Sequence, residues 1–296
     1  MKKNKKSNII LITLICLMIL YIINSTLITK NILIYTKLFL EKLFPASFLF
    51  FTFSSLLIDY NIIEKISNTL RINGANFYVI AMSLISGFPS GSKYTKDLLE
   101  KNLITEKNAN YLIKFTHFPN PVFILGPVSL LFPNKTYALK ILICIITANF
   151  IIALINHPKE KNTLLIKRKE TTSFAKALPK AILSSCKTLI IIYGTSIFFY
   201  LIITMINHYI NLPLPEYVLI NGIFDLTNGT FLTSLIANNT LRSMYIIFFF
   251  CFGGLSVHMQ TKSIIADTKI KYKNFLIGRI AQTIIACLLL ILIINW

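Results

Sequence analysis

The sequence is poor in acidic residues and in long polar stretches. Only 11 of its 296 residues are aspartate or glutamate, whereas 30 are lysine or arginine. The longest polar connection, residues 157–185, is too short to form a soluble domain with a hydrophobic core of its own. Within these residues we therefore predict no large water-soluble domain.

Motifs of the common enzyme and metal sites are also missing. The sequence has no HExxH, no GxSxG and no glycine-rich P-loop, and none of its five cysteines belongs to a CxxC pair. These absences argue against metalloprotease, serine hydrolase and ATPase chemistry, and against a disulfide framework. We expect no enzyme activity, no metal site and no cofactor.

Apolar residues make up 55% of the chain and gather in long blocks. A helix that crosses a bilayer needs ~20 such residues. The block at 43–58 is short and contains Pro45, and the block at 218–237 contains an aspartate, two asparagines and two glycines. We predict an all-α polytopic membrane protein in which these two blocks are re-entrant hairpins, and we expect the run YIIFFFCF at 245–252 to face lipid. The nine blocks are 8–26, 43–58, 76–92, 115–132, 136–156, 186–207, 218–237, 243–260 and 275–296.

Positive charge is unevenly distributed between the loops. If the two unusual blocks are hairpins, loops 1–7, 93–114, 157–187 and 261–279 lie on one side of the membrane and hold 22 of the 30 lysines and arginines. Basic loops face the cytoplasm, so we place the N-terminus there and predict seven full spans. The net charge of +19 thus indicates a lipid bilayer as partner, and not a nucleic acid.

An internal repeat divides the chain. Residues 87–108 align with residues 253–274, 166 positions later, and seven of the 22 positions are identical. Each copy follows an apolar block and ends in a further span, which is a recurring plan in transporters. The charge count puts both copies on the same side, although such repeats are commonly inverted, and the sequence leaves this open. We predict an N-terminal transmembrane helix at 1–30, a first repeat at 31–135, a connecting helix and basic cytoplasmic loop at 136–185, and a second repeat at 186–296.

The most informative stretch is SGFPSGSKYTKDLLEKNLITEKNANYLIKFTHFPNP at 86–121, where glycine and proline interrupt a polar segment beside an apolar block. Irregular backbone at membrane depth is tolerated only where it is buried in protein or lines a cavity. Gly87, Pro89 and Gly91 break a helix where Ser90 and Lys93 supply polar groups. A solute site between half-helices requires this combination, so the stretch indicates a carrier.

Two charged residues have alternative explanations. Lys93 is either an interfacial anchor or the counter-ion of an anionic solute. Asp225 is the only acid inside an apolar block. It either couples transport to H⁺ or Na⁺, or it caps a helix together with Thr227 or Asn228.

Other candidate residues surround the helix breaks. Asn120 and Pro121 either face a ligand or form a simple proline kink. His258 follows the glycines of the second copy and either relays protons or is a structural residue at the membrane interface. The residues that we predict to bind the solute are Gly87, Pro89, Ser90, Gly91, Lys93, Asn120, Pro121, Asn221, Asp225, Thr227, Asn228, Gly229, Gly253, Ser256, His258 and Gln260.

Three separated motifs resemble the sporulation integral membrane protein family with a nucleoside-recognition (Gate) domain. They are SGFPSGSK with FTHFPNPVFILGPV, then FDLTNG at 224–229, and FGGLSVHMQTKSIIADTKIKYKNFLIGRI at 252–280. The likeness runs from about residue 32 to the end of the sequence. The sequence departs from the family pattern at Asp225, where glutamate is more usual, at Leu226, which replaces isoleucine, and at His117 to Pro119, where small polar residues are common.

The resemblance implies a protein of the membrane around the forespore, similar in plan to concentrative nucleoside transporters. It also implies dipicolinate, a small aromatic dianion, as the solute. We therefore predict a sporulation transporter for a small anionic solute, with H⁺ or Na⁺ as a possible coupling ion. The alternatives are a transporter of nucleosides or other small solutes, and a membrane organiser that transports nothing. The oligomeric state is left open.

Overall fold

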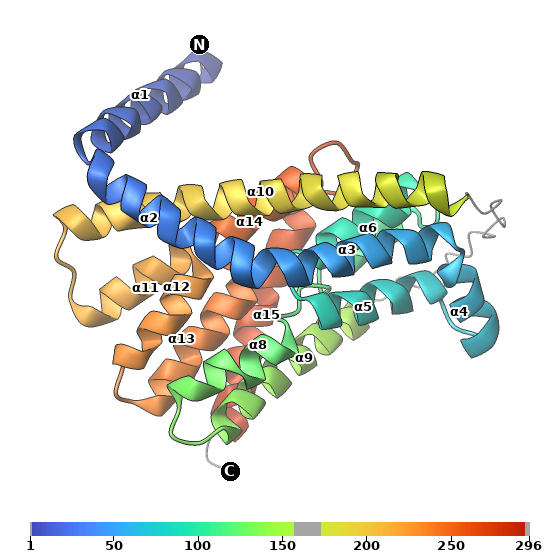
Figure 1. Cartoon of the computed structure of the whole chain (residues 1–296). Helices are drawn as coiled ribbons and strands as arrows, with labels where there is room; N and C mark the ends of the chain where they lie inside the picture. The colour runs from blue at the N-terminus through green and yellow to red at the C-terminus, as the bar shows by residue number, and fades with distance from the viewer. Residues whose placement is uncertain (1, 157–172, 294–296) are drawn as a thin grey trace. The chain divides into compact units, whose positions relative to one another are not determined.

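The structure, a computed structural model, describes residues 2–156 and 173–293 (Figure 1). The described residues form helices and no strand, which confirms an all-α polytopic membrane protein. Two compact units are present, residues 1–44 and residues 45–296. The smaller unit contains α1 (Lys2–Ile23), α2 (Ser25–Leu38) and a π-helical turn, η1 (Phe39–Leu43). The chain bends by 94° between the first two helices.

Among the described residues, four helical segments are long and apolar enough to cross a membrane. They are α9 (Thr136–Ile155), α10 (Phe174–Tyr209), α13 and α14 taken together (Asn239–Ile264), and α15 (Tyr272–Ile293). A fifth is present if the bent pair of the smaller unit is one span. The prediction of seven full spans is wrong in this respect, because the blocks at 76–92 and 115–132 form shorter, broken helices.

These shorter helices are α5 (Gly74–Ser86), α6 (Ser90–Glu100), α7 (Glu106–Leu112), α8 (Pro121–Leu125) and the 3₁₀ helix η2 (Pro127–Leu131). The 218–237 block is a helical hairpin, as predicted. Its arms are α11 (Leu214–Phe224) and α12 (Leu226–Leu232), followed by η3 (Thr233–Leu235). The arms approach so closely that a Cβ atom on Gly229 would lie 2.1 Å from the Cα atom of Gly222.

The predicted hairpin at 43–58 is wrong. From Phe44 onward these residues belong to α3 (Phe44–Asp59), a single helix with no internal break. Pro45 directly follows the π-helical turn η1, where the helical hydrogen-bond pattern is already irregular and can accommodate a residue without an N–H group. The helix ends at the turn Tyr60–Asn61, and α4 (Ile62–Leu70) follows.

The helix bounds follow the predicted repeat. The first copy consists of α5, α6 and α7, and the second of α13 (Asn239–Phe252), α14 (Gly254–Ile264) and α15. Helices α5 and α13 end at Ser86 and Phe252, and α7 and α15 begin at Glu106 and Tyr272. Both pairs of positions are 166 residues apart, so the two copies share the same order of helices and breaks.

The two copies also run in the same direction where they touch. The side chain of Asn274 donates to Asn110 Oδ1 at 2.7 Å, and further along Arg279 Nη2 donates to the carbonyl oxygen of Lys114 at 2.9 Å. These partners are 164 and 165 residues apart, close to the repeat offset. Corresponding parts of the two copies therefore lie side by side.

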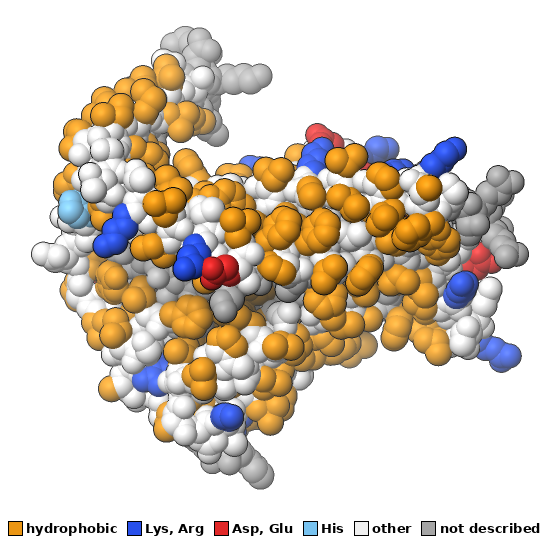
Figure 2. Space-filling model, viewed as in Figure 1, with side chains coloured by type: hydrophobic (Ala, Val, Ile, Leu, Met, Phe, Trp, Pro, Cys, Tyr) orange, Lys and Arg blue, Asp and Glu red, His pale blue; other side chains and the backbone are white. Residues whose placement is uncertain are grey.

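The hydrophobic core lies between α9, α13 and α15, which pack against one another (Figure 1). Ile246, Ile247, Phe249 and Phe250 of α13 are buried there. The expectation that the run 245–252 faces lipid is thus wrong for most of its side chains. The surface over α3 and α10 is mainly hydrophobic with few charges (Figure 2), as expected of helices that face lipid.

Candidate functional site

Both copies of the repeat contain a helix that is broken at a glycine. Gly87 ends α5 with a φ of +78°, and Gly253 ends α13 with a φ of +95°. These backbone conformations favour glycine. After Gly87 the chain passes through Phe88 and Pro89 before α6 begins, and the hydroxyl of Ser90 donates back to the carbonyl oxygen of Gly87.

The two breaks meet at the side chain of His117. The rings of His117 and Phe88 are stacked with centroids 4.7 Å apart. The Nε2 atom of His117 lies 3.2 Å from the carbonyl oxygen of Phe250, and a Cβ atom on Gly253 would lie 3.3 Å from that same nitrogen. The two broken segments therefore approach each other at this ring.

The loop between α7 and α8 holds His117 in place. A side-chain amide of α9, from Asn149, donates to the His117 carbonyl oxygen at 2.8 Å. Gly91 packs against the same loop, because a Cβ atom there would lie 2.0 Å from the carbonyl oxygen of Thr116. Asn120 caps α8 by accepting from the N–H of Val122 at 2.8 Å. Pro121 is the first residue of α8, so this pair begins a helix as expected of an Asn-Pro sequence.

The hairpin apex at Asp225 abuts the second broken helix. A Cβ atom on Gly254 would lie 3.1 Å from the carbonyl oxygen of Gly222 and 3.3 Å from the backbone nitrogen of Leu226. Asp225 is only 4% exposed and accepts a hydrogen bond of 2.8 Å from the N–H of Asn228. This is the capping geometry, and it is compatible with a second role in ion coupling.

Side-chain amides connect the two arms of the hairpin. Asn221 is buried, and its Oδ1 atom accepts from Asn228 at 2.8 Å and from Asn207 of α10 at 3.0 Å. Thr227 and Asn228 follow Asp225 on α12 and are partly buried. The polar residues of the FDLTNG motif therefore serve one compact hydrogen-bonded turn.

Lys93 lies apart from this meeting point. Its ammonium group, 2% exposed, donates to Asp97 at 2.6 Å on the same helix and lies 5.7 Å from the Phe51 ring centroid of α3. A partner carboxylate already balances its charge. The geometry thus favours a structural role for Lys93 over that of a counter-ion for a solute.

Helices α6 and α14 touch along their polar faces. Ser92 donates to Thr261 at 3.4 Å, and Ser256 is buried on α14. Gln260 donates to Ser196 of α10 at 2.7 Å, so it ties α14 to the long helix that precedes the hairpin. His258, 6% exposed, has its Nδ1 atom 2.7 Å from the Tyr272 hydroxyl.

Three buried polar residues at this centre were not among the predicted site residues: His117, Arg279 and Gln282. The sequence places Arg279 at the edge of an apolar block, and the charge count assigned it to a loop. In the structure it lies within α15 and is fully buried. The spacing of Arg279 and Gln282, three residues apart on one helical face, was the available signal.

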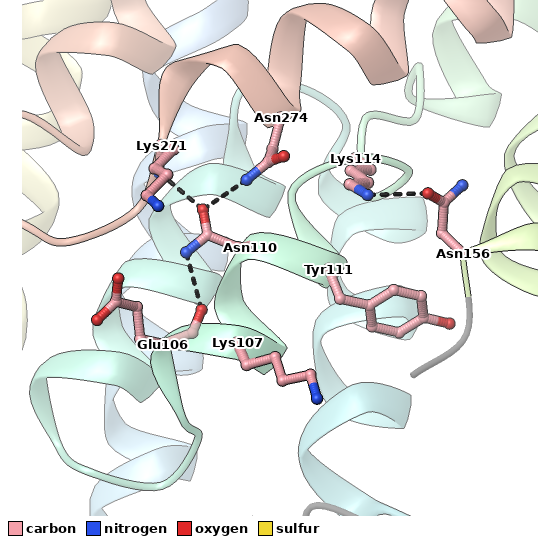
Figure 3. Close-up of a pocket in the computed structure, with 8 residues that line it drawn as sticks. All are labelled: Glu106, Lys107, Asn110, Tyr111, Lys114, Asn156, Lys271 and Asn274. Atoms are coloured by element: carbon pink, nitrogen blue, oxygen red, sulfur yellow. Dashed lines mark hydrogen bonds between the residues drawn. The ribbon is translucent and has the colours of Figure 1, made fainter. Parts of the chain in front are cut away.

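A pocket of about 560 Å³ opens beside this centre (Figure 3). Burial raises the pKa of Tyr111, whose hydroxyl donates to the carbonyl oxygen of Ala153 at 3.0 Å. Lys114 donates to Asn156 at 2.8 Å. Three lysines and one glutamate make the pocket basic. Its lining residues are Glu106, Lys107, Asn110, Tyr111, Lys114, Asn156, Lys271 and Asn274.

The chain is similar over most of its length to a known sporulation protein. It is 27% identical, over an alignment of 305 residues, to the sporulation integral membrane protein YlbJ of Bacillus subtilis (strain 168), and the alignment covers 86% of this chain and 74% of that protein. No protein-family model matches the chain. No solved structure matches it. The chain is thus similar to a sporulation integral membrane protein, and its apolar helices fit an integral membrane protein.

Proposed function

We propose that this chain is a transporter that moves a small anionic solute, dipicolinate, across the membrane around the forespore. The observation that carries the proposal is the meeting of four chain breaks. The turns at Gly87, His117, Asp225 and Gly253 connect four different pairs of helices. The Gly87 turn contacts the His117 loop, this loop contacts the Gly253 turn, and the Gly253 turn contacts the hairpin apex at Asp225.

A purely structural membrane protein has no need of this arrangement. Broken helices leave backbone N–H and C=O groups without helical partners, and each such group is costly in lipid. Transporters use the same groups to bind solutes and ions between half-helices. Buried side chains of varied chemistry surround the meeting point here, including Ser90, Asp225 and His258.

The charge distribution supports an anion as the solute. The pocket beside the meeting point is lined by Lys107, Lys114 and Lys271 against a single carboxylate, Glu106. A basic funnel raises the local concentration of anions. Dipicolinate itself enters the proposal from the family resemblance, and the similarity to YlbJ adds only that the relative is a sporulation membrane protein.

Uptake into proteoliposomes tests the proposal. Radiolabelled dipicolinate and a labelled nucleoside are offered to vesicles that contain the purified chain, with and without H⁺ and Na⁺ gradients. We expect dipicolinate to accumulate and the nucleoside to stay outside. Nucleoside uptake alone would overturn the choice of solute. Uptake of neither by correctly inserted protein would favour the membrane-organiser alternative.

The proposal includes an N-terminus in the cytoplasm. A cysteine-free variant with a single cysteine at Ser7 should be protected from a membrane-impermeant thiol reagent in intact cells. The same reagent should label a cysteine at Lys135, in the exposed turn before α9. The reverse pattern would invert the topology. Asn162, in the basic loop that we place in the cytoplasm, is a further position for such a cysteine and lies outside the described residues.

A further inference from the structure

The side chain of Arg279 is a buried cation without a buried anion. It is 0% exposed and lies on α15, inside a candidate membrane span. None of the ion pairs between described residues includes it. It donates instead to the carbonyl oxygens of Cys251 and Lys114, at 3.3 and 2.9 Å, and to Gln282 Oε1. Carbonyl dipoles balance a full charge only in part, and charges within a membrane are usually functional.

One edge of the Arg279 guanidinium group, formed by Nε and Nη2, has N–H donors without a hydrogen-bond partner in the described part of the chain. The Nε atom is buried and has no partner among the described residues, and Nη2 makes one hydrogen bond although it carries two hydrogens. Nε and Nη2 together form the edge that binds a carboxylate through two parallel hydrogen bonds. The buried edge therefore has an Nε atom without a partner in residues 2–156 and 173–293 and an Nη2 atom with a second hydrogen, and a carboxylate ligand can use both.

A second buried arginine shows the contrast. Arg242 of α13 is 9% exposed and also lacks a carboxylate partner. All three of its nitrogens donate to carbonyl oxygens, which belong to Leu131, Thr233, Ser234 and Ile236. Arg242 thus uses all its side-chain nitrogens to connect the ends of η2 and η3. In Arg279, by contrast, Nε has no partner among the described residues.

Aromatic rings lie close to the guanidinium group and to one another. The Arg279 guanidinium carbon lies 5.2 Å from the Phe275 ring centroid, and the rings of His117 and His258 lie 5.6 and 5.4 Å from the same centroid. The Nε2 atom of His258 is a second buried atom without a partner. When the Tyr272 hydroxyl donates to Nδ1, this Nε2 carries the hydrogen and can donate to a ligand.

The basic pocket lies on the approach to Arg279. Asn274 lines the pocket and precedes Arg279 by five residues on α15, which corresponds to a rise of about 7.5 Å. Lys114 joins the two sites, since its side chain lines the pocket (Figure 3) and its carbonyl oxygen accepts from Arg279. A Cβ atom on Gly278 would lie 1.9 Å from that carbonyl oxygen, so α15 and the Lys114 backbone are in direct contact here.

We propose that Arg279 is the buried anion-binding group of the transporter, that the pocket lined by Lys107, Lys114 and Lys271 leads to it, and that its ligand is a carboxylate on a flat ring. The guanidinium edge binds one carboxylate, and the rings of Phe275 and the two histidines stack on the flat ligand. His258 Nε2 donates to a second polar group of the ligand. The inference rests on the proposed transport of an anion and names the residue that recognises it.

Binding of three probes to the detergent-purified full chain tests the inference by calorimetry. The probes are pyridine-2,6-dicarboxylate, the monocarboxylate pyridine-2-carboxylate, and cyclohexane-1,3-dicarboxylate, which is not flat. We expect the first to bind most tightly. Arg279→Gln should weaken its binding at least about tenfold, because a charge-assisted carboxylate pair is lost. Arg279→Lys, which keeps the charge without the fork, should fall between the two.

Control variants separate recognition from folding. Arg242→Gln should lower the melting temperature and leave the affinity of the folded protein within about twofold. Should Arg279→Gln fail to fold, Phe275→Leu carries the test, and it should reduce the preference for the flat dicarboxylate over the cyclohexane probe. Unchanged affinity in Arg279→Lys and an unchanged ring preference in Phe275→Leu would overturn the inference. Wild-type vesicles that take up no anion would instead overturn the proposed transport.

Discussion

Gly91 is the point at which the first broken helix presses against the loop that carries His117. A Cβ atom at Gly91 would lie 2.0 Å from the carbonyl oxygen of Thr116 and 3.0 Å from Ser83 Oγ. The closer neighbour is a backbone atom, so no side-chain rotation relieves the clash. Gly91→Ala must therefore move α6 or the loop by about 1 Å or more to restore an ordinary contact distance.

The expected cost follows from overpacking. Forcing a methyl group into a filled interior costs about 1–3 kcal/mol, and the higher helix propensity of alanine offsets up to about 1 kcal/mol of that. Gly194→Ala on α10 is the matched control, because no heavy atom lies within 4 Å of its added Cβ. The control should change the free energy of unfolding by about 1 kcal/mol or less.

Thermal unfolding in detergent and initial uptake rates in vesicles measure both effects. Gly91→Ala should unfold at a lower temperature than the wild type and transport more slowly, since its displaced loop carries His117. Gly194→Ala should match the wild type in both assays. If Gly91→Ala melts and transports as the wild type does, the close contact between α6 and the loop at Thr116 does not exist in the protein.

Three further substitutions probe the polar side chains of the site. Lys93→Met should lower the free energy of unfolding by about 3–5 kcal/mol, because it leaves the partly buried Asp97 unpaired. The double variant Lys93→Met/Asp97→Leu should recover most of that loss in denaturation assays and keep the wild-type KM for uptake, whereas a raised KM would make Lys93 a solute ligand. Asn221→Leu should lower the free energy of unfolding by about 1–3 kcal/mol in the same assays, since it leaves the side-chain amides of Asn207 and Asn228 without their acceptor. An unchanged melting temperature would contradict this. Asp225→Asn keeps an oxygen that can cap α12, so the free energy of unfolding should change by less than about 1 kcal/mol. Uptake by this variant should lose its dependence on the coupling ion. If uptake keeps the ion dependence of the wild type, Asp225 has only its capping role.

Local backbone chemistry explains which structural features the sequence predicted. Gly87 and Gly253 were recognised because positive φ angles favour glycine. Pro121 was recognised as a break because proline cannot continue a preceding helix. The repeat was visible because the same breaks recur 166 residues later. None of these features depends on knowing which side chains meet in space.

Features that depend on tertiary contacts were not predicted. Lys93 is a partial exception, because its partner Asp97 lies one helical turn later on the same helix and only the burial of the pair depends on tertiary contacts. Arg279 resembles a loop charge until its helix is placed against Cys251 and Lys114, 28 and 165 residues away along the chain. The hairpin at 43–58 was predicted wrongly, since a proline that follows a π-helical turn and a proline at a hairpin break look alike in sequence.

Counterflow of dipicolinate tests the transport proposal most directly, because it needs no knowledge of the coupling ion. Vesicles that contain the purified chain are loaded with unlabelled dipicolinate and diluted into labelled dipicolinate. Transport through the site at the four chain breaks predicts a transient accumulation of label above the external concentration. This overshoot should be absent in vesicles without protein. Label that never exceeds equilibrium, in vesicles whose protein is folded and correctly inserted, would contradict the proposed function.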